Sequence, residues 1–119
     1  MEKPKIEFSE FLEIEKKLEI KLGLILTSED VPKSNKLIKL TVDFGNEDVR
    51  TVVTNIKPEL SKIWTDYHTF LVGTTFPFIT NLVPVKMMGI ESTAMIMPGN
   101  VETNEFIQRI IGPTGTKLL

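Results

Sequence analysis

The sequence predicts an all-β fold, a five-stranded barrel with short capping helices and an extension at each end. Five short segments alternate apolar and polar residues with the period of two typical of strands, and Gly, Pro and Asn separate them. Between the third and the fourth segment the period changes to that of a helix. We expect a single domain over residues 1–119, with an N-terminal helical extension over 1–18, the barrel over 19–97 and a C-terminal extension over 98–119.

The composition is that of an ordinary globular protein and excludes several classes of function. The hydrophobic and charged fractions are 41% and 25%, and no apolar run approaches the roughly 20 residues of a membrane span. The start, MEKPKIEF, lacks the apolar core of a signal peptide, so we expect a cytoplasmic protein without membrane insertion. Cysteine is absent, which excludes disulfides, thiolate catalysis and cysteine metal sites. The net charge of −2 argues mildly against nucleic-acid binding unless the 14 lysines and arginines gather on one face.

The first element expected is an amphipathic helix over residues 8–18. Phe11, Ile14 and Leu18 recur at steps of three and four, while glutamates and lysines occupy most of the other side. Ser9 is the expected N-cap, because its hydroxyl can accept a hydrogen bond from a free amide of the first turn. We expect this helix to plug one end of the barrel.

The first two strands follow. Residues 20–27 alternate as a strand does, and Gly23 within them suggests a bulge or a tight bend of the barrel. A turn-rich connection over residues 28–35 surrounds Pro32. Residues 37–44 are the second strand, with one apolar face made of Ile38, Leu40, Val42 and Phe44.

The third strand, over residues 49–56, is followed by a helical segment. Pro58 suits the first turn of a helix. The apolar residues that follow at helical spacing are Leu60, Ile63, Trp64 and Tyr67. Trp64 and Tyr67 could stack on nucleobases, but their place in this stripe favours packing in the core.

The last two strands are expected over residues 74–80 and 94–97. Pro77 suggests an edge or a bulge in the fourth strand. After a turn at residues 98–100, the apolar segment 106–111 is ambiguous between strand and helix. Five strands with a helix inserted between the third and the fourth constitute the OB arrangement.

Catalysis is not expected. His68 is the only histidine, and a lone histidine at the end of a helix is more often structural than a general base. A Ser-His-Asp triad could be assembled from Ser28, Ser34 or Ser92 with His68, but nothing in the spacing favours one. The sequence contains neither a phosphate-cradling glycine loop nor a paired-histidine metal motif. We therefore expect a protein that is not an enzyme, with no cofactor and no metal site.

The stretch from Asn81 to Met97, NLVPVKMMGIESTAMIM, is the part of the chain most informative about function. Pro84 and Gly89 are expected to interrupt regular structure, which leaves an exposed loop between two anchored strands. This loop would present one cation, Lys86, and two flexible thioethers. On composition alone, an ordinary hairpin connection whose lysine is only solvated is the favoured interpretation of the stretch.

The order of residues in this stretch resembles a signature of the tRNA-binding domain family: asparagine-leucine-x-proline-x-lysine, glycine-x-glutamate-serine, x-x-methionine. The positions that match are Asn81, Leu82, Pro84, Lys86, Gly89, Glu91, Ser92 and Met95. The family includes the C-terminal domain of many methionyl-tRNA synthetases, the endothelial monocyte-activating polypeptide, small stand-alone tRNA-binding proteins and the CsaA export chaperone. The resemblance implies an OB-type barrel that binds nucleic acid.

Three classes of function are compatible with this resemblance. The first is a non-catalytic, structure-directed tRNA-binding protein, stand-alone or auxiliary to an aminoacyl-tRNA synthetase. Its expected binding residues are the basic rim and two hydrogen-bonding side chains, namely Lys21, Lys33, Lys36, Arg50, Lys86, Asn81 and Ser92. The second is a CsaA-like chaperone that binds unfolded or pre-export polypeptide through Met87, Met88 and Met95. The third is an assembly domain that binds only protein.

Several features separate these classes, and the first class is favoured. Lys36-Leu37 and Asn81-Leu82 look more like the tRNA-binding members, whereas the acidic net charge, Val83 and Val85 weaken the basic site. A homodimer is also expected. Segments 8–18 and 106–111 supply more apolar material than five short strands require, and a contact made from them would be self-complementary.

Overall fold

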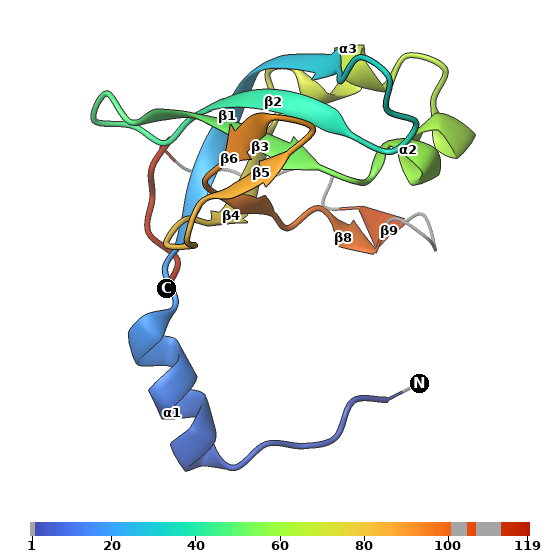
Figure 1. Ribbon diagram of the computed structural model, residues 1–119. Helices are drawn as coiled ribbons and strands as arrows, with labels where there is room; N and C mark the ends of the chain where they lie inside the picture. Colours follow the sequence, from blue (N-terminus) through green and yellow to red (C-terminus); the bar gives the residue numbers. More distant parts are fainter. Residues whose placement is uncertain (1, 101–104, 107–112) are drawn as a thin grey trace.

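The computed structural model describes residues 2–100, 105–106 and 113–119 (Figure 1). Strands predominate, and two short helices lie between the third and the fourth strand. In chain order the elements are α1 (Phe8–Lys17), β1 (Ile20–Asp30), β2 (Ile38–Asp43), β3 (Val49–Thr54), α2 (Lys57–Ile63), α3 (Tyr67–Leu71), β4 (Thr75–Ile79), β5 (Val85–Met87), β6 (Ile90–Ser92), β7 (Met95–Ile96), β8 (Gly99–Asn100) and β9 (Glu105–Phe106).

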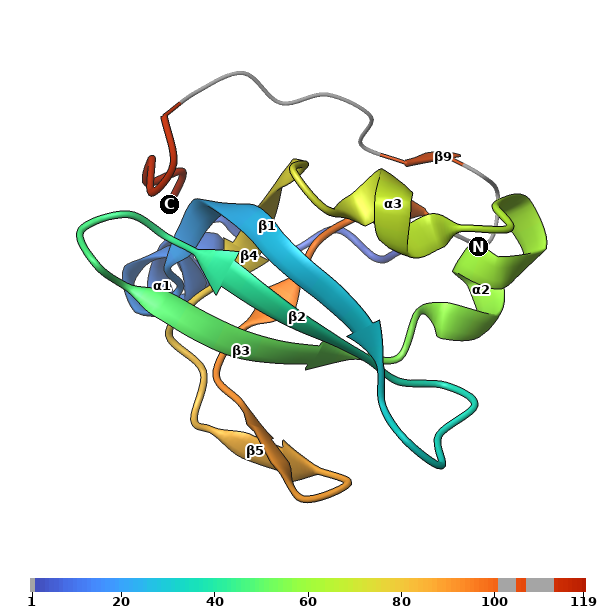
Figure 2. The same ribbon diagram turned by 90° about the horizontal axis from the view of Figure 1, so that it is seen from above.

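Five of the strands form one antiparallel sheet in the order β3-β2-β1-β4-β7, and this sheet curls into a half-barrel (Figures 1 and 2). The free edge of β3 meets the segment that contains β6. The Val53 amide donates to Ser92 Oγ at 3.0 Å, and the Thr93 amide donates to Thr51 O at 3.4 Å. These bonds close the curl on that side, so the predicted OB-type barrel is confirmed.

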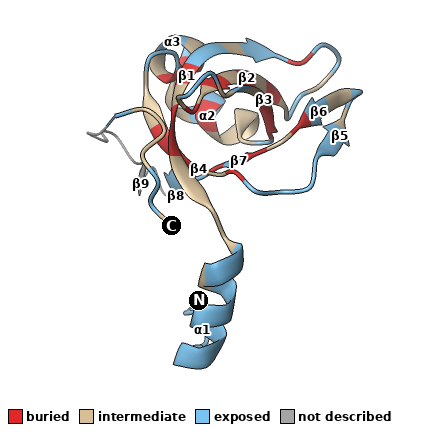
Figure 3. Cartoon of the chain, turned by 90° about the vertical axis from the view of Figure 1, so that its left-hand side faces the viewer, coloured by how far each residue is buried: buried red, intermediate tan, exposed pale blue. Residues whose placement is uncertain are grey.

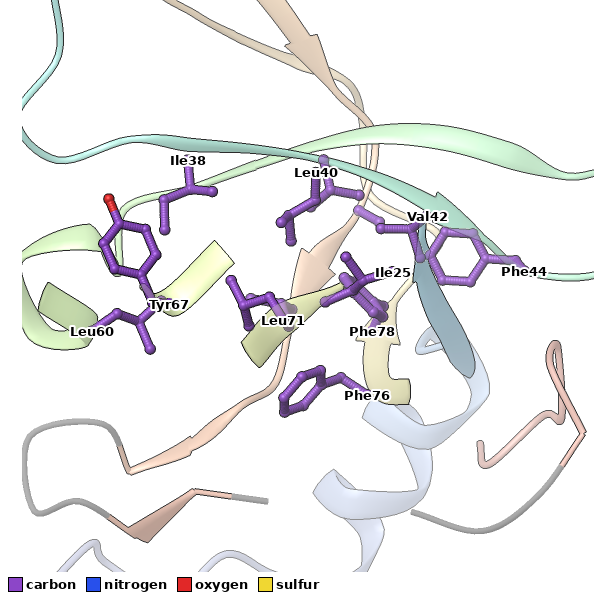
Figure 4. Close-up of a cluster of buried hydrophobic side chains, with 13 residues drawn as sticks. Ile25, Ile38, Leu40, Val42, Phe44, Leu60, Tyr67, Leu71, Phe76 and Phe78 are labelled. Atoms are coloured by element: carbon purple, nitrogen blue, oxygen red, sulfur yellow. The ribbon is translucent and has the colours of Figure 1, made fainter. Parts of the chain in front are cut away.

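The core lies inside the curl, where the inward residues of the strands meet the helices (Figure 4). Ile38, Leu40 and Val42 of β2 are fully buried, as their alternation predicts. Phe44 and Phe78 meet edge to face, with ring centroids 5.3 Å apart. Burying one such side chain contributes about 1.5–3 kcal/mol, so this cluster is the main force that holds the sheet curled.

Gly23 lies on the inner face of β1, where a side chain would not fit. A Cβ atom there would lie 2.5 Å from Val42 Cγ1 and 2.6 Å from Phe44 Cε1. Of the two alternatives expected at Gly23, a bulge or a tight bend, the bulge is not found there, because the register shifts between Ile25 and Thr27 instead. β1 also continues to Asp30, so the connection to β2 is shorter than the expected 28–35.

Residues 113–119 lie beside the first half of β1, which β2 does not cover. The Leu22 amide donates to Thr116 O at 2.9 Å, and the Gly115 amide donates to Leu22 O at 2.8 Å. Leu22 is buried, although it is not part of the core cluster. Of the predicted apolar segment 106–111, Phe106 belongs to β9, and residues 107–111 lie outside the described residues.

The expectation that Pro77 marks an edge or a bulge is wrong. β4 lies between β1 and β7, and Pro77 pairs with Leu22 in regular register. Proline is tolerated because the Leu22 amide bonds to Thr116, so the missing N–H of Pro77 removes no bond between the two strands. The carbonyl of Pro77 still accepts from the Met97 amide at 2.9 Å.

The predicted helical segment after β3 is split into α2 and α3. Asp66 caps α3 by accepting from the Thr69 amide at 3.3 Å, which starts a new helix after a short break. Tyr67 is buried in the core, and Trp64 packs against the core from outside. The Trp64 ring stacks on Phe70, with ring centroids 4.2 Å apart. The expected core packing of both aromatic residues is confirmed.

Helix α1 projects away from the barrel instead of plugging it, so that prediction is wrong (Figures 1 and 3). None of its residues is buried, and Phe8 is 72% exposed. Leu60, Tyr67 and Leu71 of α2 and α3 supply the helical side chains that the core needs. Ser9 is not the N-cap either, because the helix begins at Phe8 after Glu7.

Candidate nucleic-acid interface

The stretch between β4 and β7 contains a two-stranded hairpin, β5–β6, instead of the expected irregular loop. Lys86 pairs with Glu91, and Met88 and Gly89 form the two-residue turn with φ values of 52° and 79°. Positive φ at both turn positions suits the twist of a tight hairpin, and glycine adopts it without strain. Pro84 therefore precedes the hairpin and Gly89 lies in its turn, and neither residue disrupts it. The expected exposure of Lys86 and Met88 is observed.

Two residues of the predicted site, Asn81 and Ser92, make hydrogen bonds within the chain. Ser92 is 5% exposed, and its hydroxyl accepts from the Val53 amide and donates to Ala94 O at 3.3 Å. Asn81 is exposed, but its Oδ1 accepts from the Glu19 amide at 2.9 Å and its Nδ2 donates to Lys17 O. Ser92 thus fixes the hairpin to β3, and Asn81 fixes the junction of α1 and β1.

The guanidinium of Arg50, also predicted for the site, is directed into the protein. It forms a bidentate pair with Asp48, with Nε–Oδ1 and Nη2–Oδ2 distances of 2.9 Å each. Nη1 donates to Thr80 O at 2.7 Å, and the guanidinium carbon lies 5.2 Å from the centroid of the Phe44 ring. The hydrogen bonds from Arg50 hold the pKa of Asp48 below its usual range. Arg50 therefore connects β3 to the end of β4.

The predicted lysines divide into two groups at opposite ends of β1. Lys21, near the start of β1, lies 3.7 Å from a carboxylate oxygen of Glu19. Lys33 and Lys36 are exposed in the β1–β2 loop (residues 31–37), and Lys86 is exposed on β5. In the described part of the chain, none of these last three lysines forms an ion pair. In Figure 2 the teal β1–β2 loop and the orange hairpin project to the same side of the sheet.

An apolar groove of about 370 Å³ lies at the base of the hairpin. Met87 and Met95, two of the three predicted methionines, line it, whereas Met88 is at the hairpin turn and 56% exposed. The lining residues come from the end of β3 and its continuation, from the start of the hairpin and from β7: Val53, Thr54, Asn55, Ile56, Leu82, Val83, Val85, Met87, Ser92, Ala94, Met95 and Ile96.

Sequence reasoning did not find most of this groove. One signal was present, because Val83, Val85 and Met87 alternate with polar or conformationally rigid residues and so share one face of an exposed strand. Val83 is 83% exposed and adjoins other exposed apolar residues, Val85 and Met95, and contiguous apolar surface of this kind marks binding sites. Lys86 lies between two lining residues and is directed to the other face of the hairpin.

A polar cluster at the far end of β1 was also missed as a unit. His68 Nδ1 lies 2.6 Å from Ser28 Oγ, and His68 Nε2 lies 3.1 Å from Asp30 Oδ1. The Tyr67 hydroxyl donates to the same Asp30 oxygen at 2.7 Å and, with His68, lowers the pKa of Asp30. Burial and the neighbouring Asp30 raise the pKa of Tyr67 to about 12. The structure thus joins a serine, the histidine and an aspartate although their spacing gave no sign of it.

Two further kinds of site were sought within residues 2–100, 105–106 and 113–119. No group of three or more His, Asp or Glu side chains there is arranged to hold a metal ion. No helix in the same residues is long and apolar enough to cross a bilayer.

Comparison with known sequences gives one family. The family described as a putative tRNA binding domain matches residues 20–116. The chain is 38% identical over 117 residues to the methionine–tRNA ligase of Methanospirillum hungatei. This match covers 97% of the chain but only 16% of the ligase. It is 38% identical over 104 residues to the ligase of Helicobacter pylori, of which it spans 14%.

Solved structures agree with this family. A MetRS-related protein of Pyrococcus horikoshii has a TM-score of 0.75 at 30% identity, and the match covers 98% of this chain and all of the other. The chaperone CsaA of Bacillus anthracis has a TM-score of 0.69 at 22% identity over 98% of this chain and all of its own. At that identity the likeness to CsaA is one of fold.

Proposed function

The chain belongs to the tRNA-binding domain family, and from that premise we propose that it is a non-catalytic module that recognises folded tRNA by its shape. The observation that carries the proposal is the placement of three exposed cations that form no ion pair with any residue the structure describes. Lys33 and Lys36 lie on the β1–β2 loop and Lys86 on the β4–β7 connection. In OB folds these two connections flank the strands that bind oligonucleotides.

Phosphate contacts would dominate the interaction. The aromatic residues best suited to base stacking, Trp64 and Tyr67, pack in or against the core. The three exposed cations of the proposed site are lysines, which act as point charges. Each phosphate neutralised adds roughly 0.7–0.9 to the slope of log affinity against log salt, so three lysines predict a slope of about −2 to −3. Arg50, Asn81 and Ser92 would act indirectly, by holding the barrel and the hairpin in place.

The test is a titration with unmodified tRNA at several salt concentrations. A variant with Lys33, Lys36 and Lys86 replaced by glutamine should bind weakly, with a slope near zero. The matched control replaces Lys3, Lys5 and Lys16, three exposed lysines of the N-terminal extension, and so changes the net charge equally. If the salt slope becomes equally shallow in both variants, only the overall charge matters, and this result would contradict the proposed site.

We propose further that the module acts in the cytoplasm, alone or as a subunit that serves an aminoacyl-tRNA synthetase. Similarity to methionine–tRNA ligases supports a synthetase partner, since the chain spans only a small part of each ligase that it matches. The end-to-end match to the MetRS-related protein supports a chain that acts by itself. Co-purification of a tagged chain with a synthetase, before and after ribonuclease treatment, would separate these two arrangements.

The apolar groove favours a second candidate function, the binding of unfolded or pre-export polypeptide. Met87 and Met95 lie on its wall, and flexible thioethers adapt to varied apolar side chains. Replacing both by serine should abolish binding of a reduced, unfolded polypeptide, measured by fluorescence anisotropy, and should leave the tRNA salt slope unchanged. If the double variant loses tRNA binding as well, the groove and the lysines form one RNA site. If the wild-type chain binds polypeptide but no tRNA, the chaperone function replaces the first proposal.

A homodimer through α1 is proposed as well. The helix exposes Phe8, Phe11 and Ile14 on one side, and a second copy of the chain would cover this face in a self-complementary contact. Sedimentation equilibrium at tens of micromolar should give the dimer mass, and a Phe8→Ser, Phe11→Ser variant should give the monomer mass. A wild-type monomer at that concentration would contradict the proposal.

A further inference from the structure

Asp30 is the meeting point of three elements. Its Oδ1 accepts from the Tyr67 hydroxyl at 2.7 Å, lies 3.1 Å from His68 Nε2 on α3, and lies 3.4 Å from Lys57 Nζ on α2. Ser28, two residues earlier on β1, holds the other ring nitrogen of His68. The Asp30 side chain is 51% exposed, so packing of the core does not explain why three side chains converge on it.

The same contacts reach the loop that carries two of the proposed RNA-binding lysines. Lys57 Nζ also donates to Ser34 O at 3.3 Å, and the Lys57 amide donates to Lys36 O at 3.3 Å. Within the loop, Ser34 Oγ accepts from the amides of Lys36 and Leu37 at 3.2 and 3.0 Å. The β1–β2 loop is therefore fastened to α2 through Lys57, whose ammonium pairs with Asp30.

The conformation of the loop is one that needs such support. Lys33 has a φ of 67°, in the left-handed region that residues with a side chain seldom adopt. Adopting it costs free energy that the surrounding bonds must offset. The turn itself is closed by the Ser34 amide, which donates to Val31 O at 3.1 Å, but among the described residues only the bonds to Lys57 fasten it to α2. Without them the loop would move relative to the barrel, and Lys33 and Lys36 would lose their fixed direction.

We propose that Asp30 is a positioning residue for RNA binding: it orients Lys57, and through Lys57 it holds the β1–β2 loop in the conformation that presents Lys33 and Lys36. The inference rests on the proposed tRNA-binding function. Asp30 does not contact RNA in this account, and its carboxylate would repel phosphate if it did. Loss of the Asp30 charge should therefore weaken RNA binding if Asp30 positions the loop, and strengthen it if only charge matters.

The test compares Asp30→Asn with Glu29→Gln. Both changes remove one negative charge, and Glu29 is the exposed neighbour of Asp30 on β1. If only charge matters, both variants should bind tRNA slightly more tightly than the wild type. The positioning role predicts that Asp30→Asn instead binds about twofold to fivefold more weakly with a shallower salt slope, because a partly exposed ion pair is lost. Tighter binding in both variants would overturn the proposal.

A second variant and a measurement without RNA complete the test. Tyr67→Phe removes one hydrogen bond to Asp30 without altering charge or the buried ring. Hydrogen exchange at the amides of Leu37 and Lys57 should be faster in Tyr67→Phe and in Asp30→Asn than in the wild type and Glu29→Gln. Unchanged exchange would refute the role of Asp30 in the loop. If the wild type binds no tRNA, the proposed function fails, and the exchange result still decides whether Asp30 orders the loop.

Discussion

Replacing Arg50 by methionine should weaken the fold and leave RNA binding unchanged. Methionine keeps an unbranched apolar chain beside the Phe44 ring, but it removes the guanidinium. The bonds lost are the bidentate pair with Asp48, at 2.9 Å for each contact, and the bond to Thr80 O at 2.7 Å. The Asp48 pair orients the guanidinium, and the bond to Thr80 O joins β3 to the residue that follows β4, so the loss of both loosens the barrel at that point.

The size of the effect follows from burial. A hydrogen bond to a charged group contributes about 1.5–3 kcal/mol. The Arg50 and Asp48 side chains are 24% and 33% exposed, so solvent screening reduces the sum considerably. We expect the free energy of unfolding to fall by about 1–3 kcal/mol. Urea unfolding followed by circular dichroism measures it directly.

Lys86→Met is the matched control, because it removes one cation from the exposed face of the hairpin. It should change the free energy of unfolding by less than about 0.5 kcal/mol but should make the salt slope of tRNA binding shallower by about one. The reasoning is refuted if Arg50→Met is as stable as the wild type. It is equally refuted if Arg50→Met reduces the salt slope as much as Lys86→Met does.

Two other predictions concern stability. Because the pKa of Asp48 is lowered in the folded state, its pair with Arg50 contributes stability above the usual value of about 3.8 and loses it as pH falls through the lower folded value. Wild-type stability should therefore fall more steeply than that of Arg50→Met between about pH 5 and pH 2, and parallel urea curves would contradict this. Gly23→Ala should cost about 1–3 kcal/mol by overpacking. The cost should shrink in a Val42→Ala background, because Val42 Cγ1 is the nearest atom, and an equal cost in both backgrounds would rule out this clash.

The strands and the order of elements could be predicted because burial inside a curled sheet imposes a period of two. Ile38, Leu40 and Val42 display that period and are fully buried. The direction of α1 could not be predicted in the same way. An amphipathic pattern predicts that one face of the helix is buried, but it does not predict whether the barrel or another chain covers that face.

Within the candidate site, the sequence could predict which residues are exposed, but not which of them bond to other parts of the chain. Lys33, Lys36 and Lys86 occupy loops or a hairpin, and such positions can be read from turn residues nearby. The partners of Arg50 include Thr80 and Thr93, which are far from it in sequence, so nothing local distinguishes a structural arginine from one that binds phosphate. The groove is still more difficult to predict from the sequence, because its walls come from three separate segments.

The most direct test of the central claim is to map where tRNA contacts the chain by NMR. Backbone amide shifts would be recorded during a titration of the labelled protein with tRNA at low salt. The account predicts the largest changes in the β1–β2 loop and in residues 82–92, with little change around Lys21 and along α1. Changes concentrated at Lys21 and on α1, with Lys33, Lys36 and Lys86 unaffected, would contradict it.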